Sequence, residues 1–165
     1  MRRKTALYGL LVALAFILSY LESLLPLSIG IPGIKLGLAN AVTLTALYLL
    51  RPADGLVVAG IRIVLVGLTF GSPATMLYSA AGGTLSFLVM WLCRRSSRFS
   101  VLGTSMAGGV SHNIGQLLMA MAVLQTRQVI WYAPVLLLAG LLTGGLIGVL
   151  VRLLLPRLQG VLGGK

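Results

Sequence analysis

Acidic residues are almost missing from this chain of 165 residues, which has two, Glu22 and Asp54. So few carboxylates exclude paired acid–base catalysis, a carboxylate site for Mg²⁺ or Ca²⁺, and an acidic pair that would bind a diphosphate through metal. The sequence also lacks a glycine loop followed by Lys-Ser or Lys-Thr, which would hold the phosphates of ATP. We therefore expect a protein that is not itself an enzyme and has no resident cofactor or metal.

Cysteine and charge are scarce as well. Cys93 is the one cysteine, so an internal disulfide and a cysteine metal cluster are excluded. Charged residues make up 9% of the chain and hydrophobic residues 58%, and the mean hydropathy is +1.05. These values exclude a soluble protein and predict an integral membrane protein.

Positive charge, in contrast, is abundant, because 13 Lys and Arg give a formal net charge of +11. In a soluble chain such an excess would indicate a nucleic-acid partner. Here the basic residues mostly flank apolar runs, where they set membrane orientation and contact lipid headgroups. We expect a lipid bilayer as the partner and no nucleic acid.

Hydropathy predicts the number of helices. A membrane-spanning helix needs roughly 20 mostly apolar residues. Six segments fit, and clusters of Pro, Gly, Ser or Arg separate them as turns. The segments are 5–25, 35–50, 54–70, 73–93, 102–124 and 130–155. The sequence thus predicts one all-α domain over residues 1–165, a compact bundle of six transmembrane helices whose first helix is retained rather than cleaved.

Basic residues predict which ends of these helices face the cytoplasm. With the N-terminus inside, nine of them flank the inner ends, whereas Lys35 and Arg127 flank the outer ends. The nine are Arg2, Arg3, Lys4, Arg51, Arg94, Arg95, Arg98, Arg157 and Lys165. Arg152 can snorkel to the inner surface, whereas Arg62 falls near the middle of the third segment. Both termini are therefore expected in the cytoplasm.

Polar side chains are predicted to gather in the middle and outer half of the membrane. They are Glu22, Lys35, Asn40, Arg62, Tyr78, His112, Asn113 and Gln116. Positions 112 and 116 share a helix face, as do 113 and 116, so these three can converge. Lys35 and Arg62 outnumber the one acid at that level, so we expect a neutral to positive cavity. Such a cavity suits a carboxylate, a phosphate or an electron-rich ring.

These residues also have structural interpretations. Polar side chains in spans often join neighbouring helices, at about 0.6 kcal/mol for each pair. An Arg in the middle of a span costs about 2.5 to 3.5 kcal/mol, so Arg62 is a functional candidate unless it forms a structural ion pair with Glu22. His112 could likewise be a core histidine with satisfied hydrogen bonds.

Two further features belong to the first helix and the loop after it. Gly9-x-x-x-Ala13 could present a flat docking surface to another membrane protein, although most of the 21 glycines are expected to serve packing between helices. The loop PLSIGIPGIK is moderately apolar and contains two prolines and two glycines. We hypothesise that it folds over the polar residues as a lid.

Four motifs carry a family resemblance: SYLESLLP, PGIKLGLAN, YSAAGG and GGVSHNIGQ, in this order. Together they resemble the Gx transporter family, also named heptaprenyl diphosphate synthase component I, over nearly the whole chain. That family is grouped with the S components of bacterial energy-coupling-factor vitamin importers. The resemblance implies an S-component-like six-helix bundle in the plasma membrane of a bacterium, with a ligand pocket on the outer side under the first loop. It also implies docking through helix one to a transmembrane coupling subunit driven by two ATPases, although S components typically carry Ala-x-x-x-Ala where this chain has Gly9-x-x-x-Ala13.

Three functions are open on these grounds. The leading hypothesis is an S-component-like substrate-binding and uptake protein for a small anionic or aromatic nutrient or cofactor precursor. The first alternative is an accessory membrane subunit of heptaprenyl diphosphate or menaquinone biosynthesis, in which Lys35 and Arg62 hold a lipid diphosphate while a soluble partner does the chemistry. The second alternative is a structural subunit of a membrane redox complex, in which the polar residues only join helices.

Overall fold

The computed structural model describes residues 2–24, 35 and 37–163, with the side chains of residues 5–24, 35 and 37–160. This part of the chain is helical and contains no strand. The elements are α1 (Arg2–Leu24), α2 (Asn40–Leu49), α3 (Pro52–Thr69), α4 (Pro73–Ser96), α5 (Val101–Leu124), the 3₁₀ helix η1 (Arg127–Tyr132) and α6 (Ala133–Gly163). The all-α prediction is confirmed. The loop hypothesised to be a lid lies outside the described residues apart from Lys35.

Four stretches are long and apolar enough to cross a membrane: Thr5–Leu24, Pro52–Thr69, Pro73–Ser96 and Arg127–Gly160. The last of them joins η1 to α6. α5 has 24 residues, but its Ser, His, Asn and Gln side chains lower its hydropathy and it is not among the four. The chain is a helical protein of membrane type, and the crossing of the bilayer by all six helices stays a prediction.

α2 differs most from its sequence prediction, a continuous helix over 35–50. It has ten residues and is about 15 Å long, roughly half the thickness of a bilayer's hydrocarbon core. Gly37 has a φ of +86°, and the Asn40 N–H donates to the Gly37 carbonyl oxygen at 2.8 Å. The prediction of a helix from residue 35 was wrong because this turn, which needs a left-handed residue, comes first.

Local sequence explains other helix ends. Pro73 occupies the first turn of α4, where its missing N–H costs nothing, and Ser72 and Thr75 form a capping box around it. α6 starts later than the predicted segment 130–155 because η1 precedes it. α6 then continues past Pro156 and ends at Gly163.

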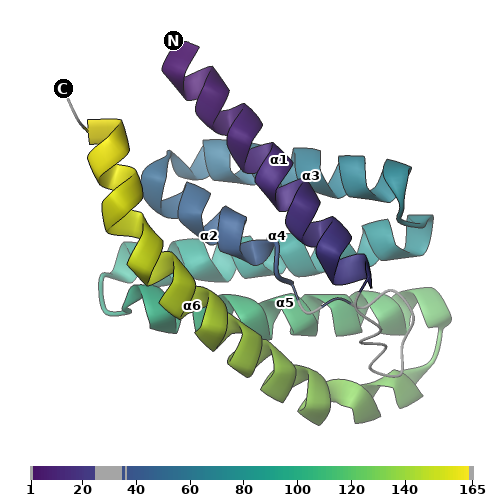
Figure 1. Ribbon diagram of the computed structural model, residues 1–165. Coiled ribbons are helices and arrows are strands. Elements are labelled where there is room, and N and C mark those ends of the chain that lie inside the picture. Colours follow the sequence, from purple (N-terminus) through teal and green to yellow (C-terminus); the bar gives the residue numbers. More distant parts are fainter. Residues whose placement is uncertain (1, 25–34, 36, 164–165) are drawn as a thin grey trace.

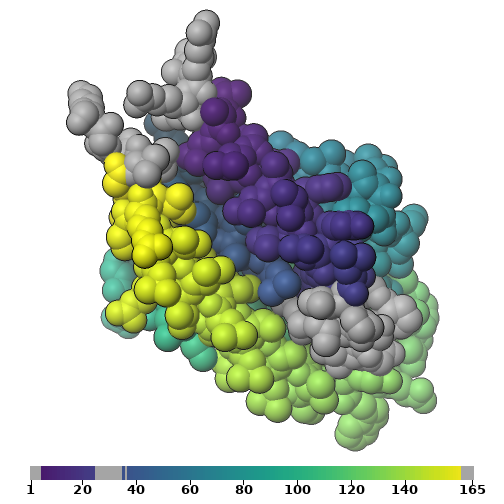
Figure 2. All heavy atoms as spheres, viewed as in Figure 1, coloured from purple at the N-terminus to yellow at the C-terminus, as the bar shows by residue number. Residues whose placement is uncertain are grey.

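α2 lies at the centre of the bundle and contacts each of the other five α-helices. In Figure 1, α3, α4 and α5 run side by side, and α1 and α6 cross in front of them. Among the described elements α1 contacts only α2 and α3, and it makes no contact with α6. Figure 2 shows α2 in the space between purple α1 and yellow-green α6. A short helix in this position is surrounded by protein rather than by lipid.

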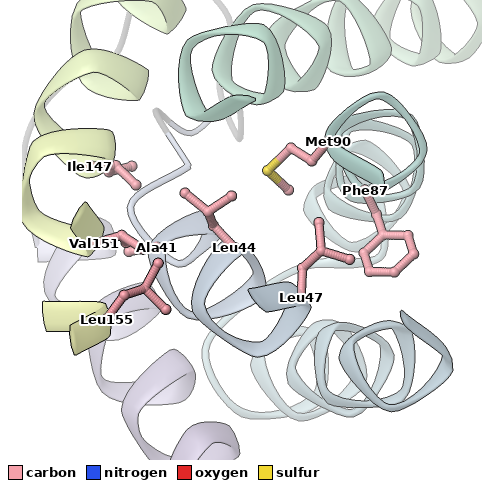
Figure 3. Close-up of a cluster of buried hydrophobic side chains, with 8 residues drawn as sticks. All are labelled: Ala41, Leu44, Leu47, Phe87, Met90, Ile147, Val151 and Leu155. Atoms are coloured by element: carbon pink, nitrogen blue, oxygen red, sulfur yellow. The ribbon is translucent and has the colours of Figure 1, made fainter. Parts of the chain in front are cut away.

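The apolar core surrounds the C-terminal part of α2. Eight side chains from α2, α4 and α6 make it up (Figure 3): Ala41, Leu44, Leu47, Phe87, Met90, Ile147, Val151 and Leu155. Leu44 and Leu47 are fully buried. Since lipid is as apolar as leucine, these contacts stabilise the bundle by close packing rather than by removal from water. They hold α2 so that its first residue, Asn40, lies at the polar side chains described below.

Glycine brings α5 very close to both of its neighbours. A Cβ built on Gly109 would overlap the carbonyl oxygen of Gly140 on α6. A Cβ built on Gly115 would lie 2.7 Å from the carbonyl oxygen of Ala81 on α4. Small residues at such positions let helix backbones approach closely. The close approach fixes how α5 presents its polar residues to the rest of the bundle.

Candidate functional site

Six buried polar side chains from four helices converge in what we call the polar cluster. They are Ser19 and Glu22 of α1, Asn40 of α2, Arg62 of α3, and His112 and Gln116 of α5. None of them is more than 6% exposed. Burying polar groups is costly unless they find hydrogen-bond partners, so the partners of each group decide what the cluster can do.

Glu22 ties α1 to the segment that leads into α2. Its Oε1 accepts a hydrogen bond from the Gly37 N–H at 2.5 Å. A Cβ built on Gly37 would lie 2.8 Å from Asn40 Nδ2 and 3.1 Å from His112 Cδ2. Glycine is therefore required here both by the positive φ and by the close approach of these two side chains. Through Gly37, the carboxylate of α1 is connected to α2 and α5.

Arg62 is buried midway along α3 with most of its donors unused. Its Nη1 donates to Ser19 Oγ at 3.4 Å, a long contact. Among the described residues its Nε and Nη2 have no hydrogen-bond partner. No ion pair joins Arg62 to Glu22 in this part of the chain. The structural ion pair considered as an alternative explanation of Arg62 is therefore not formed.

His112 and Gln116 lie one turn apart on α5 and both face Gly82 of α4. A Cβ on Gly82 would be 2.8 Å from Gln116 Cγ and 3.0 Å from His112 Nδ1. The adjacent Gly83 lies near Arg62, because a Cβ there would be 3.9 Å from Arg62 Nη2. Gln116 is completely buried, yet neither of its polar side-chain atoms finds a partner in the described residues, nor does His112 Nδ1. α4 thus contributes glycine backbone, not side chains, to the cluster.

Three predicted residues are placed differently. Asn113 is directed to α6, where its Nδ2 donates to the Leu136 carbonyl oxygen at 2.6 Å, so it does not converge with Gln116. Tyr78 is buried in a separate apolar cluster that includes Leu117 and Leu136. Lys35 is half-buried, with its Nζ 5.5 Å from the centroid of the Phe70 ring. The structure therefore places Lys35 beside the aromatic ring that directly follows α3.

The unpaired atoms of the polar cluster are mostly hydrogen-bond donors. Arg62 Nε and Nη2, Asn40 Nδ2 and Gln116 Nε2 all carry N–H groups without a partner in the residues the structure describes. A group with acceptor atoms, such as a carboxylate, carbonyl, ring nitrogen or phosphate, would complement them. No group of three or more His, Cys, Asp or Glu in the described residues could hold a metal ion. The cluster is suited to binding and orienting an acceptor-rich molecule.

Comparison with known proteins places the chain in a family. The sequence model of heptaprenyl diphosphate synthase component I matches residues 11–154, which include every member of the polar cluster. The chain belongs to this family. The resemblance carried by the four sequence motifs is thereby confirmed. Neither the curated proteins nor the solved structures gave a match.

Sequence reasoning missed three residues of the candidate site. Ser19 could have been found, because it lies one turn before Glu22 on the same face of α1. Gly37 and Gly82 both lie in the family motifs, but nothing in the sequence shows that His112 packs against each of them. These contacts depend on how four helices meet.

Variants of Asn113 and Gln116 can distinguish a polar residue that joins two helices from one that binds a ligand. We expect Asn113→Ala to lower the free energy of unfolding by about 1 kcal/mol, because it removes the hydrogen bond to α6, and to leave ligand affinity unchanged. Gln116→Ala should weaken ligand binding with little loss of stability, because its amide has no partner in the described residues. Thermal unfolding and ligand titration of both variants in detergent test this. Equal losses of affinity in the two variants would contradict it.

Proposed function

We propose that this protein is the substrate-binding subunit of an uptake system in the plasma membrane of a bacterium, similar in role to an S component. Its ligand would be a small anionic or aromatic nutrient or cofactor precursor bound at the polar cluster. One observation carries the proposal: the buried polar atoms of Arg62, Asn40, His112 and Gln116 that lack partners among the described residues. Each unpaired buried group costs about 1–3 kcal/mol, which a ligand with matching acceptors would recover.

The proposal includes a six-helix bundle in the membrane with both termini in the cytoplasm. The α2–α3 and α4–α5 connections lie on the side of Figure 1 toward which the start of α1 and the end of α6 point. Arg51 lies in the first connection and Arg98 in the second, shortly after Arg94 and Arg95 in the last turn of α4. An excess of basic residues favours this side as the cytoplasmic one. α2 would be a half-length helix buried among the other five, with the polar cluster at its outer end.

The proposed partners are a transmembrane coupling subunit, which would dock on α1, and the two ATPase subunits that drive it. No described atom lies within 4 Å of a Cβ built on Gly9, and Ala13 on the same face is exposed. Leu10 and Ile17 on this side of α1 are 64% and 52% exposed. Since α1 contacts only α2 and α3 among the described elements, it leaves a broad face for another membrane helix.

The double variant Gly9→Leu/Ala13→Leu should therefore block docking without unfolding the protein. We expect the double variant to change the free energy of unfolding by less than about 1 kcal/mol, since both sites are exposed. It should lose the ATPase subunits on purification from its own membranes. The matched control is Gly60→Leu on α3, where a Cβ also meets no described atom within 4 Å. Retention of the ATPases by the α1 variant would rule out this docking face.

The family description favours a second candidate, an accessory membrane subunit of heptaprenyl diphosphate synthesis. In that case Arg62 and Lys35 would hold the diphosphate of a prenyl lipid. The chemistry would belong to a soluble partner, because the two acids of this chain cannot form an Asp-rich metal site.

Native mass spectrometry of the protein, extracted gently from its own membranes, tests both candidates. A retained small metabolite together with ATPase subunits would support the uptake proposal and identify the substrate. A retained prenyl lipid with a soluble synthase would replace it by the second candidate. A stable partner without any ligand would instead indicate a structural subunit of a membrane complex. Arg62→Met, prepared in parallel, shows whether a retained molecule occupies the polar cluster.

A further inference from the structure

A shallow pocket with two arginines lies at the opposite end of α2 from the polar cluster. A pocket of about 170 Å³ is lined there by Pro52 at the start of α3 and by Trp91, Arg94 and Arg95 near the end of α4. α2 begins at the polar cluster and ends at Leu49, shortly before Pro52. The pocket therefore plays no part in the binding of the proposed substrate.

The two arginines of this pocket are held against aromatic rings. Arg94 Cζ lies 5.2 Å from the centroid of the Tyr48 ring, and Arg95 Cζ lies 5.8 Å from that of Trp91. The Tyr48 hydroxyl donates to Thr104 Oγ1 at 3.4 Å, which links the first of these rings to α5. In the described part of the chain neither arginine is paired with a carboxylate. A guanidinium stacked on a ring keeps the N–H groups at its edge available for an anion.

Backbone dipoles do not cancel the positive charge of the pocket. The end of α4 has a partial negative charge and the start of α3 a partial positive charge, so the two roughly offset each other. Asp54 in the first turn of α3 is the one acid at this end, and the exposed Arg51 beside it offsets its charge. Arg94 and Arg95 would also stabilise the end of α4 by themselves. That structural role, however, does not account for a pocket between two helices.

We propose that this pocket binds the phosphate headgroup of an anionic membrane lipid. The apolar surface next to it favours a lipid over a soluble anion. Leu56, one turn beyond Pro52 on α3, is 47% exposed, and Leu88, one turn before Trp91 on α4, is 45% exposed. Acyl chains of a lipid seated in the pocket would lie along these two leucines. Trp at the membrane interface and basic pockets between spanning helices are typical of such sites.

Trp91 gives a direct measurement, because its fluorescence is quenched by a brominated acyl chain in contact with it. The second tryptophan, Trp131, is 82% exposed and can be replaced by Trp131→Phe. This single-tryptophan protein would be reconstituted in bilayers of phosphatidylcholine containing brominated phosphatidylglycerol, or brominated phosphatidylcholine as the reference. The double variant Arg94→Gln/Arg95→Gln tests the pocket. Arg98→Gln, an exposed arginine outside the pocket lining, is the matched control.

We expect Trp91 to prefer phosphatidylglycerol over phosphatidylcholine by about 25-fold, since each of the two arginines near an anionic lipid contributes about fivefold. The double variant should lose this preference and Arg98→Gln should keep it. If the double variant does not fold, Arg95→Gln alone, at an exposed position, should lose about half of the preference on a logarithmic scale. Equal quenching by both lipids, or an unchanged preference in the pocket variants, would overturn the proposal. Loss of the preference in excess inorganic phosphate would also overturn it, because the site would then bind a soluble anion.

Discussion

Arg62→Met is expected to weaken ligand binding by about 100-fold, which corresponds to roughly 3 kcal/mol, without destabilising the fold. The affinity falls because Arg62 supplies charged N–H donors, two of whose nitrogens have no partner in the described residues. The fold is retained because methionine fills similar space, and replacing a poorly paired buried charge by an apolar side chain is often neutral or stabilising. Ligand titration and thermal unfolding of the same preparation measure both quantities.

The control for this prediction is Arg152→Met, which removes a charge from an exposed position on α6. It should leave ligand affinity unchanged. If Arg62→Met kept the affinity of the parent and lost stability, Arg62 would be a structural residue and the polar cluster would not be the binding site. A loss of both would show that Ser19 and Arg62 hold α1 to α3 more strongly than their 3.4 Å contact indicates.

Gly109→Ala is expected to lower the free energy of unfolding by about 3 kcal/mol, the largest stability effect that we predict. One added methyl group would overlap the carbonyl oxygen of Gly140, and it would lie 3.2 Å from both the Gly140 carbonyl carbon and the Gly144 Cα. Both obstacles are backbone of α6, so no change of side-chain rotamer relieves them and the two helices must separate. Unfolding of the variant in detergent by heat or denaturant measures the loss.

Gly145→Ala provides the matched control, because it adds the same methyl group to α6 where no described atom lies within 4 Å. We expect its stability to be unchanged or raised by less than about 1 kcal/mol, since alanine favours the helix. If both variants lost the same stability, helix-wide effects of the added methyl group would explain the loss. The close crossing of α5 and α6 would then not be the cause.

Gly109 affects the polar cluster through helix packing, whereas Arg62 belongs to the cluster itself. Gly109 and its neighbours bring α5 close to α6 and α4, and that approach sets where His112 and Gln116 point. Arg62 reaches the same region from α3 and Glu22 from α1. A change at the helix crossing is therefore expected to alter ligand binding indirectly as well, whereas Arg62→Met should alter it directly while the helices stay in place.

Composition and periodicity account for much of the architecture of this protein. The near absence of acids, the long apolar runs and the turn residues between them predicted an all-α membrane protein, and five predicted helices correspond to α1, α3, α4, α5 and α6. The cost of burying charge pointed to Arg62 and Glu22, and helical spacing brought His112 and Gln116 together. The helices and the burial of these side chains follow from local hydropathy and from the spacing of residues one helical turn apart.

Contacts between distant segments set the remaining features. They shortened the helix predicted over 35–50, since the Gly37 turn is coupled to Glu22 by a hydrogen bond across 15 positions of sequence. They directed Asn113 to α6 and Tyr78 into an apolar cluster, and they left Arg62 without the ion pair to Glu22 that was its alternative explanation. Helical periodicity states which residues share a face, but the neighbour of that face is set by the packing of glycine-rich helices, which no local pattern encodes.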